Sequence, residues 1–414
     1  MNKTSIIDFF VRDIGFVEKK SSIIANDRVL GEDFLPEKIL HREDQLKIIL
    51  SSLKDFLVSR RGVNMLFYGN TGTGKTLLAR YIGSVMKSIT ISKKANIKVS
   101  YINCKSLISR EADYYVIGKI YSDVTNERFR KGKRKYEMIE NLFDYLSNHD
   151  FKLILFLDEF DSLINEKNNE DILYLLLRDF DIELPSKISL ILISNNITFL
   201  NNLDPRTKSS FSSFIKVEFP PYNAEALREI LKDRAKLAIR EGAIDQSIIN
   251  YISAKVAKYF SGDARVAINV LRLSALIADS KNKSKIDKDD VDEAFENIDF
   301  DIIKSIVFSL NSTQRLLMLS LINIIIRNND IYVSFEDLYE EYCKLSSSLS
   351  ISSLGKSAVY KNMRNLEMIL GNFIESKAIS EGKRGGYKKI YKLLMDEKDI
   401  KKIYDLLYRN ILNA

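Results

Sequence analysis

The sequence has few residues that bind zinc and no long apolar run. Its two cysteines and two histidines lie scattered, at Cys104, Cys343, His41 and His149, and do not make a structural zinc site on their own. We expect the two thiols to be reduced, as in an intracellular protein. The longest apolar runs, LILFL at 153–157 and ISLILI at 188–193, have the length of a strand and are far too short to span a membrane. The amino-terminal MNKTSIIDFFVRD carries charges and no cleavage motif, so we expect no secretory signal.

The composition indicates a globular protein of two to four domains, with 414 residues, 45% of them hydrophobic and 29% charged. The net charge is +7, and the basic residues are clustered in the sequence. Residues 351–410 hold 13 Lys and Arg against 7 Asp and Glu, and RFRKGKRK at 128–135 holds six basic residues in eight. Such patches fit a polyanionic partner, and they equally fit two solvated surfaces without a ligand.

The order of apolar patterns predicts three structural parts. Between residues 65 and 192, short apolar strands alternate with helical patterns, which is typical of an α/β fold with a parallel sheet covered on both faces. From residue 223 the strand signals stop, and four helices fit 223–242, 245–260, 263–279 and 287–297. After about residue 302, three helices precede two strands joined by a glycine-rich basic tip. That is the order of a winged helix.

The motif GNTGTGKT at 69–76 lies between a strand and a helix. Its glycines let backbone N–H groups surround phosphates at a helix N-terminus. We expect Lys75 to reach the outer phosphates and the Thr76 hydroxyl to bind Mg²⁺.

Acidic residues end the next buried strand, LILFLDEFD. Asp158 would hold Mg²⁺ through water, and Glu159 would orient or deprotonate the attacking water. Asn195 ends the strand ISLILISN and suits a sensor of the γ-phosphate or of water, although an asparagine can also simply end a strand. Arg265 lies in the first turn of a helix, where the dipole disfavours it. We expect it to reach across from a lid domain to the γ-phosphate.

With these motifs in this order, the chain resembles AAA+ ATPases. More narrowly it resembles the archaeal replication initiators of the origin-recognition/cell-division-control family, through FLPEKILHREDQL (34–46), LDPRTKSSF and VEFPPYNAEAL (203–227), GDARVAINVLR and the carboxy-terminal winged helix. The resemblance implies an amino-terminal extension (1–20), an AAA+ domain (21–218), a helical lid (219–302) and a winged-helix domain (303–414).

The resemblance also implies roles for individual residues. Asn195 would be sensor 1 and Arg265 sensor 2, and Pro36, Ile39 and Arg42 would lie near the adenine. The set expected to bind ATP or ADP comprises Pro36, Ile39, Arg42, Asn70, Thr71, Gly72, Thr73, Gly74, Lys75, Thr76, Leu77, Tyr222 and Arg265, with Thr76 and Asp158 as the Mg²⁺ ligands.

One element departs from many AAA+ proteins. Ser210 stands where we would align the arginine finger, and Arg206 or Lys208 would have to replace it. A finger contributes about 10³–10⁵ in rate. We therefore expect slow hydrolysis and a nucleotide switch rather than a motor.

Two regions are expected to bind DNA: the winged helix, through its third helix and its wing, and a basic cluster near residue 130. On the third carboxy-terminal helix Val359, Met363, Leu366 and Leu370 form the inward stripe, while Ser357, Lys361 and Arg364, with Tyr360 beside them, form the face that would enter the major groove. Lys383, Arg384 and Tyr387 belong to the wing. By resemblance, the cluster with Arg130, Lys131, Lys133 and Arg134 also touches DNA.

The resulting hypothesis is an ATP-controlled initiator, cytoplasmic and nucleoid-associated, that binds double-stranded origin DNA and helps load a replicative helicase. A paralogous initiator is a possible further partner, and no membrane is expected. Two alternatives stay open: a clamp-loader-like or remodelling ATPase, and a nucleotide-regulated transcription factor.

Overall fold

A computed structural model describes residues 23–58, 62–93, 96–107, 112–128, 132, 134–164, 187–195, 200, 208–209, 211–328, 332–349, 351–380, 387–395 and 397–412. The chain divides into two compact units, residues 1–291 and 292–414. The extension expected at 1–20 lies outside the described residues. Within the described residues, no helix is long and apolar enough to cross a membrane. Cys104 is buried, Cys343 is half-buried, and neither forms a disulfide.

The first unit contains a five-stranded parallel sheet of order β2-β3-β4-β1-β5. Its strands are β1 (Met65–Tyr68), β2 (Ile97–Asn103), β3 (Lys152–Asp158), β4 (Ile188–Ser194) and β5 (Ile215–Glu218). Their near-continuous apolar sequences follow from burial on both faces, as expected for a parallel sheet.

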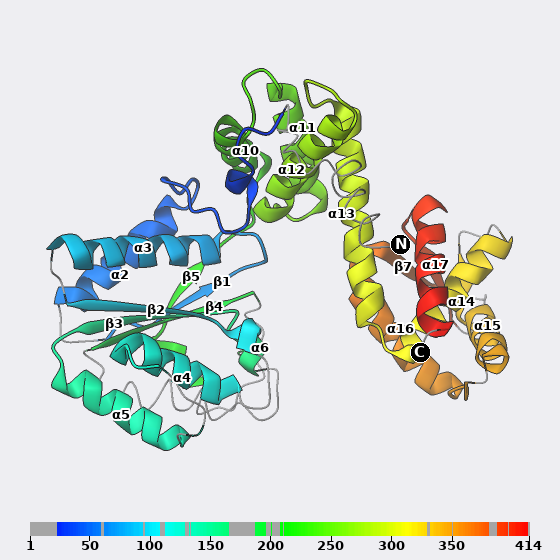
Figure 1. The fold of residues 1–414 in the computed structure, drawn as a ribbon. Helices are drawn as coiled ribbons and strands as arrows, with labels where there is room; N and C mark the ends of the chain where they lie inside the picture. Colours follow the sequence, from blue (N-terminus) through cyan, green and yellow to red (C-terminus); the bar gives the residue numbers. More distant parts are fainter. Residues whose placement is uncertain are drawn as a thin grey trace, which may run out of the picture. The chain divides into compact units, whose positions relative to one another are not determined.

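Helices cover both faces of this sheet (Figure 1). They are α2 (Glu43–Val58) and α3 (Lys75–Lys93) on one face, and α4 (Ala112–Thr125) and α5 (Lys135–Asn148) on the other. Alternation along β3 serves both cores, because Leu155 packs toward α4 and α5 whereas Ile154 and Phe156 pack toward α2 and α3. Short elements complete this part: η3 (Cys104–Leu107), α6 (Asp161–Ile164) and η6 (Phe211–Ser213).

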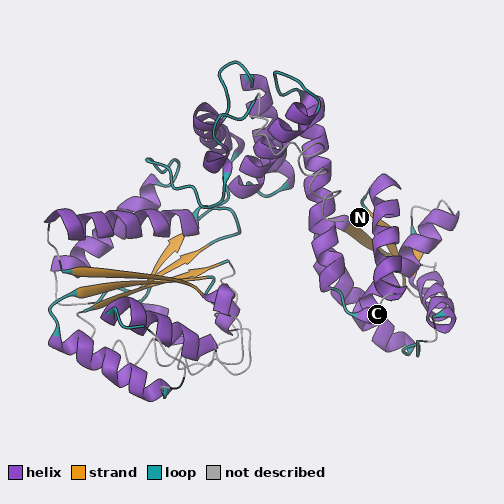
Figure 2. Cartoon of the chain, in the orientation of Figure 1, coloured by secondary structure: helices purple, strands orange, loops and turns teal. Residues whose placement is uncertain are grey.

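The lid is built from helices (Figure 2). They are α10 (Ala224–Ala238), α11 (Gln246–Tyr259), α12 (Ala264–Ser280) and the start of α13 (Lys288–Ser309). Asn223 caps α10 as its sequence predicts, since its side chain accepts from the Ala226 N–H at 2.8 Å. The helix expected at 287–297 is longer than that and continues through residue 302, where we expected the winged-helix part to begin.

An amino-terminal segment packs on the lid and not on the sheet. This segment, residues 23–30, includes η2 (Asp27–Leu30). Ile24 forms a bridge with Ile239, and Asp27 receives two 2.7 Å hydrogen bonds from Arg272. A side-chain hydrogen bond from Arg272 lowers the pKa of Asp27. Residues 23–30 thus extend the lid, although the expected boundary assigned them to the AAA+ domain.

The second unit has the predicted winged-helix order. Helices α14 (Ser312–Asn328), α15 (Phe335–Ser348) and α16 (Lys356–Leu370) precede the hairpin of β7 (Ile374–Ser380) and β8 (Tyr387–Leu393). Three elements were not predicted: the short strand β6 (Val333–Ser334), which pairs with β8, η7 (Gly371–Phe373), and the terminal helix α17 (Glu397–Leu412). One core joins these elements, with Met363, Leu366 and Tyr391 fully buried in it.

Candidate functional site

The GNTGTGKT loop follows β1 and passes directly into α3, as its sequence predicts. Gly72 and Gly74 have φ of 66° and 90°, in the left-handed region that favours glycine. A Cβ on Gly74 would lie 2.6 Å from the Tyr222 hydroxyl. The loop therefore needs glycine for its backbone path and for the close approach of its neighbours.

Lys75 is turned into this loop and is only 4% exposed. Its Nζ donates to the Gly69 and Asn70 carbonyl oxygens at 2.7 and 2.6 Å. Burial, and next to it the charge of Arg265, lower the pKa of Lys75 to about 8. A buried ammonium has lost its hydration, so an adjacent polyanion would stabilise its charged form strongly. This fits the phosphate contact expected of Lys75.

Asp158 and Thr76 meet at the carboxyl end of β3. Asp158 is 1% exposed, and its Oδ2 accepts from the Thr76 Oγ1 at 2.8 Å. The Asp158 Oδ1 accepts the backbone N–H of Glu159 at 2.9 Å. A hydroxyl and a carboxylate side by side form the hard oxygen donor set that Mg²⁺ prefers, so these residues fit the metal expected here.

Glu159 is placed differently, although it is the next residue. Its φ is 52°, unusual for a residue other than glycine. Its carboxylate lies 3.4 Å from the Lys105 Nζ and 3.5 Å from the Asn103 Nδ2, at the end of β2. The backbone thus turns Asp158 and Glu159 toward separate partners. Sequence reasoning did not single out Asn103 or Lys105.

Asn195 follows β4, the neighbour of β3 in the sheet. It is half-buried, and its backbone N–H donates to the Asp161 Oδ1 at 3.4 Å. The sensor position at the carboxyl edge is therefore the one expected, while the sensing role itself stays a prediction.

The lid touches the phosphate-binding loop through Asp263. Its Oδ1 caps α12 by accepting the Arg265 and Val266 N–H groups at 2.7 and 3.2 Å. Its Oδ2 accepts from the Thr71 hydroxyl at 3.2 Å, and the Ala264 N–H donates to the Gly72 carbonyl at 3.1 Å. The carboxylate at the start of this helix offsets the unfavourable position of Arg265, and it connects lid and loop directly.

Arg42 links the segment FLPEKILHREDQL (34–46) to the same loop. It is 4% exposed, and it donates through Nε to the Thr73 carbonyl at 2.9 Å and through Nη2 to the Pro220 carbonyl at 2.6 Å. Its guanidinium lies 3.8 Å over the Tyr222 ring. Pro36, which precedes Arg42 in the same segment, is buried, and Ile39 packs against the core under α2 and α3. Arg42 and Tyr222 thus form a clasp around the loop, and their contact with adenine stays a prediction.

The two faces of α16 are the ones its sequence predicts. Val359, Met363, Leu366 and Leu370 are at most 1% exposed. The opposite side exposes Ser357, Lys361, Arg364 and, at 39%, Tyr360. The Tyr360 ring stands edge-on against Phe335 at 5.1 Å, which fixes it beside the basic face.

Several predicted residues cannot be placed. Arg134 is exposed at the start of α5, but Arg130, Lys131 and Lys133 lie outside the described residues. The same holds for Lys383 and Arg384, and for the side chain of Tyr387 at the start of β8. Of the residues discussed for a finger, Lys208 is exposed, whereas Arg206 and Ser210 lie outside the described part of the chain.

Three family models match consecutive stretches of the chain. They are the ATPase family associated with various cellular activities (AAA) over 65–219, the Cdc6 AAA+ ATPase-type lid domain over 228–296, and the CDC6 C-terminal winged helix domain over 306–403. Fold and site together define an AAA+ P-loop ATPase with a helical lid and a carboxy-terminal winged helix.

Comparison with similar proteins identifies the family within this class. The chain is 31% identical to ORC1-type DNA replication protein 1 of Sulfolobus acidocaldarius, over 90% of each chain. It is 31% identical to the protein of that name from Methanosarcina mazei, over 89% of this chain and 87% of that one. The chain belongs to the family of ORC1-type DNA replication proteins. A solved structure of Aeropyrum pernix ORC1 in complex with DNA is 29% identical, with a TM-score of 0.76, and covers 95% of this chain and 100% of that one.

Proposed function

We propose that this protein is an ATP-controlled replication initiator that binds double-stranded origin DNA and helps recruit or load the replicative helicase. The observation that carries the proposal is the exposed Ser357, Lys361 and Arg364 face of α16, which lies over a fully buried stripe, in a chain that also has a complete phosphate-binding loop. The relative from Aeropyrum pernix, solved in complex with DNA, supports the same reading.

The nucleotide would be ATP or ADP, bound by the loop and the Arg42–Tyr222 clasp. Thr76 and Asp158 would hold Mg²⁺, which when bound supplies charge neutralisation on the phosphates. Lys75 would turn toward the outer phosphates, and Asn195 and Arg265 would contact the γ-phosphate from the sheet edge and from the lid. Glu159 would orient the attacking water and accept its proton on the carboxylate. Asn103 and Lys105 hold that carboxylate in place.

We propose that hydrolysis is slow and that the bound nucleotide sets the state of the lid. Ser210 stands in place of the aligned arginine finger, and Lys208 is exposed. The direct connection of Asp263 to Thr71 gives the lid a means of responding to the loop. ADP would then persist as a resting ligand, and a paralogous initiator would be a natural partner at the neighbouring site.

DNA contact would use α16 in the major groove, where Arg364 and Lys361 can read guanine and Ser357 can fix a phosphate. Lys383, Arg384 and Tyr387 of the wing would add backbone contacts. The basic cluster with Arg130, Lys131, Lys133 and Arg134 would add a second region. The protein would act on the nucleoid in the cytoplasm.

The test is binding of the purified protein to fragments of its own genome across a salt series, beside Arg364→Ala. The wild-type protein should enrich a few discrete loci. Arg364→Ala should lose about 1–3 kcal/mol of discrimination between these loci and other fragments. Lys344→Ala is the matched control, because Lys344 is also exposed in the second unit but lies on α15. Sequence-blind binding by the wild type that falls steeply with salt would contradict origin recognition.

A further inference from the structure

Tyr101 lies on β2, the edge strand of the parallel sheet. The register pairs Tyr101 with Phe156 and Asn103 with Asp158 of β3. Because side chains alternate along a strand, Tyr101 and Asn103 lie on the same face of β2. At the carboxyl end of β3, Tyr101 contacts Asp158, the predicted metal ligand, and Asn103 contacts Glu159.

The Tyr101 hydroxyl donates a short hydrogen bond to the Asp158 Oδ2. The Thr76 hydroxyl donates to the same oxygen at 2.8 Å, and the Glu159 N–H donates to the other carboxylate oxygen. Three donors thus fix a carboxylate that is 1% exposed. Thr76 and Asp158 are the expected Mg²⁺ ligands, so when these two residues turn to the metal Tyr101 is the side-chain donor that remains, beside the Glu159 N–H.

The ring of Tyr101 is itself held from two sides. Phe156 lies 6.2 Å from its centroid, and the Arg80 guanidinium lies 5.9 Å from it. Arg80 is in turn paired with Asp33 at 2.9 Å. Burial and the charge of Asp158 raise the pKa of Tyr101.

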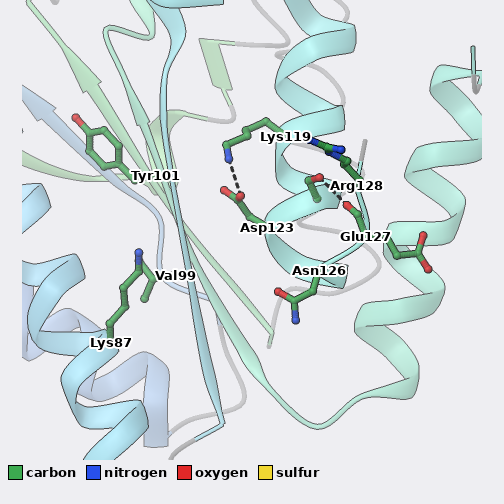
Figure 3. Close-up of a pocket in the computed structure, with 9 residues that line it drawn as sticks. Lys87, Val99, Tyr101, Lys119, Asp123, Asn126, Glu127 and Arg128 are labelled. Carbon is green, nitrogen blue, oxygen red and sulfur yellow. Dashed lines mark hydrogen bonds and ion pairs between the residues drawn. The ribbon is translucent and has the colours of Figure 1, made fainter. Parts of the chain in front are cut away.

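The same ring lines a pocket of about 640 Å³ between α3, β2 and α4. Figure 3 shows the Tyr101 hydroxyl pointing away from Lys119 and Asp123 on the α4 side of this pocket. Replacement of Tyr101 by phenylalanine would keep this wall and remove the donor alone.

We propose that Tyr101 is a positioning residue for Asp158 and thereby sets the affinity of the protein–nucleotide complex for Mg²⁺. The proposal rests on the nucleotide function proposed above. Two effects oppose each other when the hydroxyl is lost: the carboxylate gains charge density, and it loses a fixed orientation. Orientation dominates, because Asp158 is expected to hold the metal through water, where direction matters more than a small change in charge. Loss of the hydrogen-bond partner of a directly bound ligand typically weakens metal binding by about 10- to 100-fold. We expect the lower end of this range here, because water would lie between Asp158 and the metal.

The experiment is a Mg²⁺ titration of a fluorescent ATP analogue bound to wild type, Tyr101→Phe and Tyr121→Phe. Tyr121 is the matched control, because it is likewise a tyrosine that donates a hydrogen bond to a carboxylate, that of Glu127, after α4. Tyr101→Phe should raise the Mg²⁺ concentration for half-maximal response by about tenfold. Its affinity for the analogue in EDTA should equal that of the wild type, and Tyr121→Phe should match the wild type in both respects.

A second measurement separates positioning from general damage. In an Asp158→Asn background, Tyr101→Phe should change the Mg²⁺ response by less than about twofold, because the two residues act through one carboxylate. Three outcomes would overturn the role of Tyr101 alone. The Mg²⁺ concentration for half-maximal response could stay unchanged in Tyr101→Phe, or it could shift equally in Tyr101→Phe and Tyr121→Phe. The effects of Tyr101→Phe and Asp158→Asn on this concentration could also be additive. A wild type that ignores Mg²⁺ would overturn the proposed nucleotide function, and this role with it.

Discussion

Lys75 illustrates how a residue can oppose folding at the position where the proposed nucleotide would bind. Its ammonium is buried against the Gly69 and Asn70 carbonyls, and burial lowers its pKa to about 8. A free lysine in the unfolded chain titrates near 10.4. Between these two values the unfolded state binds more protons than the native state, so the stability of the protein rises with pH in that window. Below pH 8 both states carry the charge, and the full penalty is present.

The prediction at this residue is therefore a pH-dependent difference. The unfolding free energy of the wild type, relative to Lys75→Met, should rise by about 2 kcal/mol between pH 7.5 and 9.5. Urea unfolding at the two pH values measures it, and other titrating groups cancel in the comparison. Lys75→Met should also lose nucleotide binding. A difference between the two proteins that stayed constant with pH would show that Lys75 is solvated in the native state.

At the scale of elements, the contact between α12 and the phosphate-binding loop depends on a missing side chain. A Cβ on Gly72 would stand 1.8 Å from the Asp263 Oδ1, and the φ of Gly72 is 66°. Gly242 has a similar φ of 78°, but a Cβ there would meet nothing within 4 Å. The two glycines therefore share a left-handed backbone conformation, and they differ in whether an added side chain would also clash with the lid.

Gly242→Ala should lower the unfolding free energy by about 1–2 kcal/mol, the cost of a left-handed alanine. Gly72→Ala should lower it further, because α12 must also move. Adding Asp263→Ala to Gly72→Ala should restore part of the unfolding free energy that Gly72→Ala loses beyond Gly242→Ala. Thermal unfolding of Gly242→Ala, Gly72→Ala, Asp263→Ala and the double variant would measure this. Equal losses at the two glycines would mean that α12 does not rest on the loop.

What the sequence could predict at this scale was local. The P-loop, the cap at Asn223 and the two faces of α16 follow from spacing within one element, and all three are confirmed. The contacts that were missed join distant segments. Tyr101 reaches Asp158 through the register of two strands, and Arg272 pairs with Asp27 across 245 positions. The continuation of α13 was missed because NIDFDII interrupts the apolar period with carboxylates.

At the scale of the whole molecule, the chain combines a P-loop in its first unit with a basic stretch in its second unit. Residues 351–410 carry the excess of Lys and Arg, whereas the nucleotide elements lie before residue 291. A clamp-loader-like or remodelling ATPase with rapid ATP turnover would need a cation from a neighbouring protomer at the phosphates. Ser210 stands where we expect the arginine finger of many AAA+ proteins, and Lys208 is exposed shortly before η6.

The last prediction distinguishes a switch from such a rapid ATPase. ATP turnover per protomer should stay below about 0.1 per second, far under the rates of about 1–100 per second of dedicated phosphoryl-transfer enzymes. It should also stay flat as protein concentration rises, because no assembly step completes the site. Lys208→Ala should leave this rate unchanged, and Lys75→Ala should abolish it. A rate that climbed with concentration and fell in Lys208→Ala would show a finger acting between protomers, and would favour the clamp-loader-like alternative over the initiator switch.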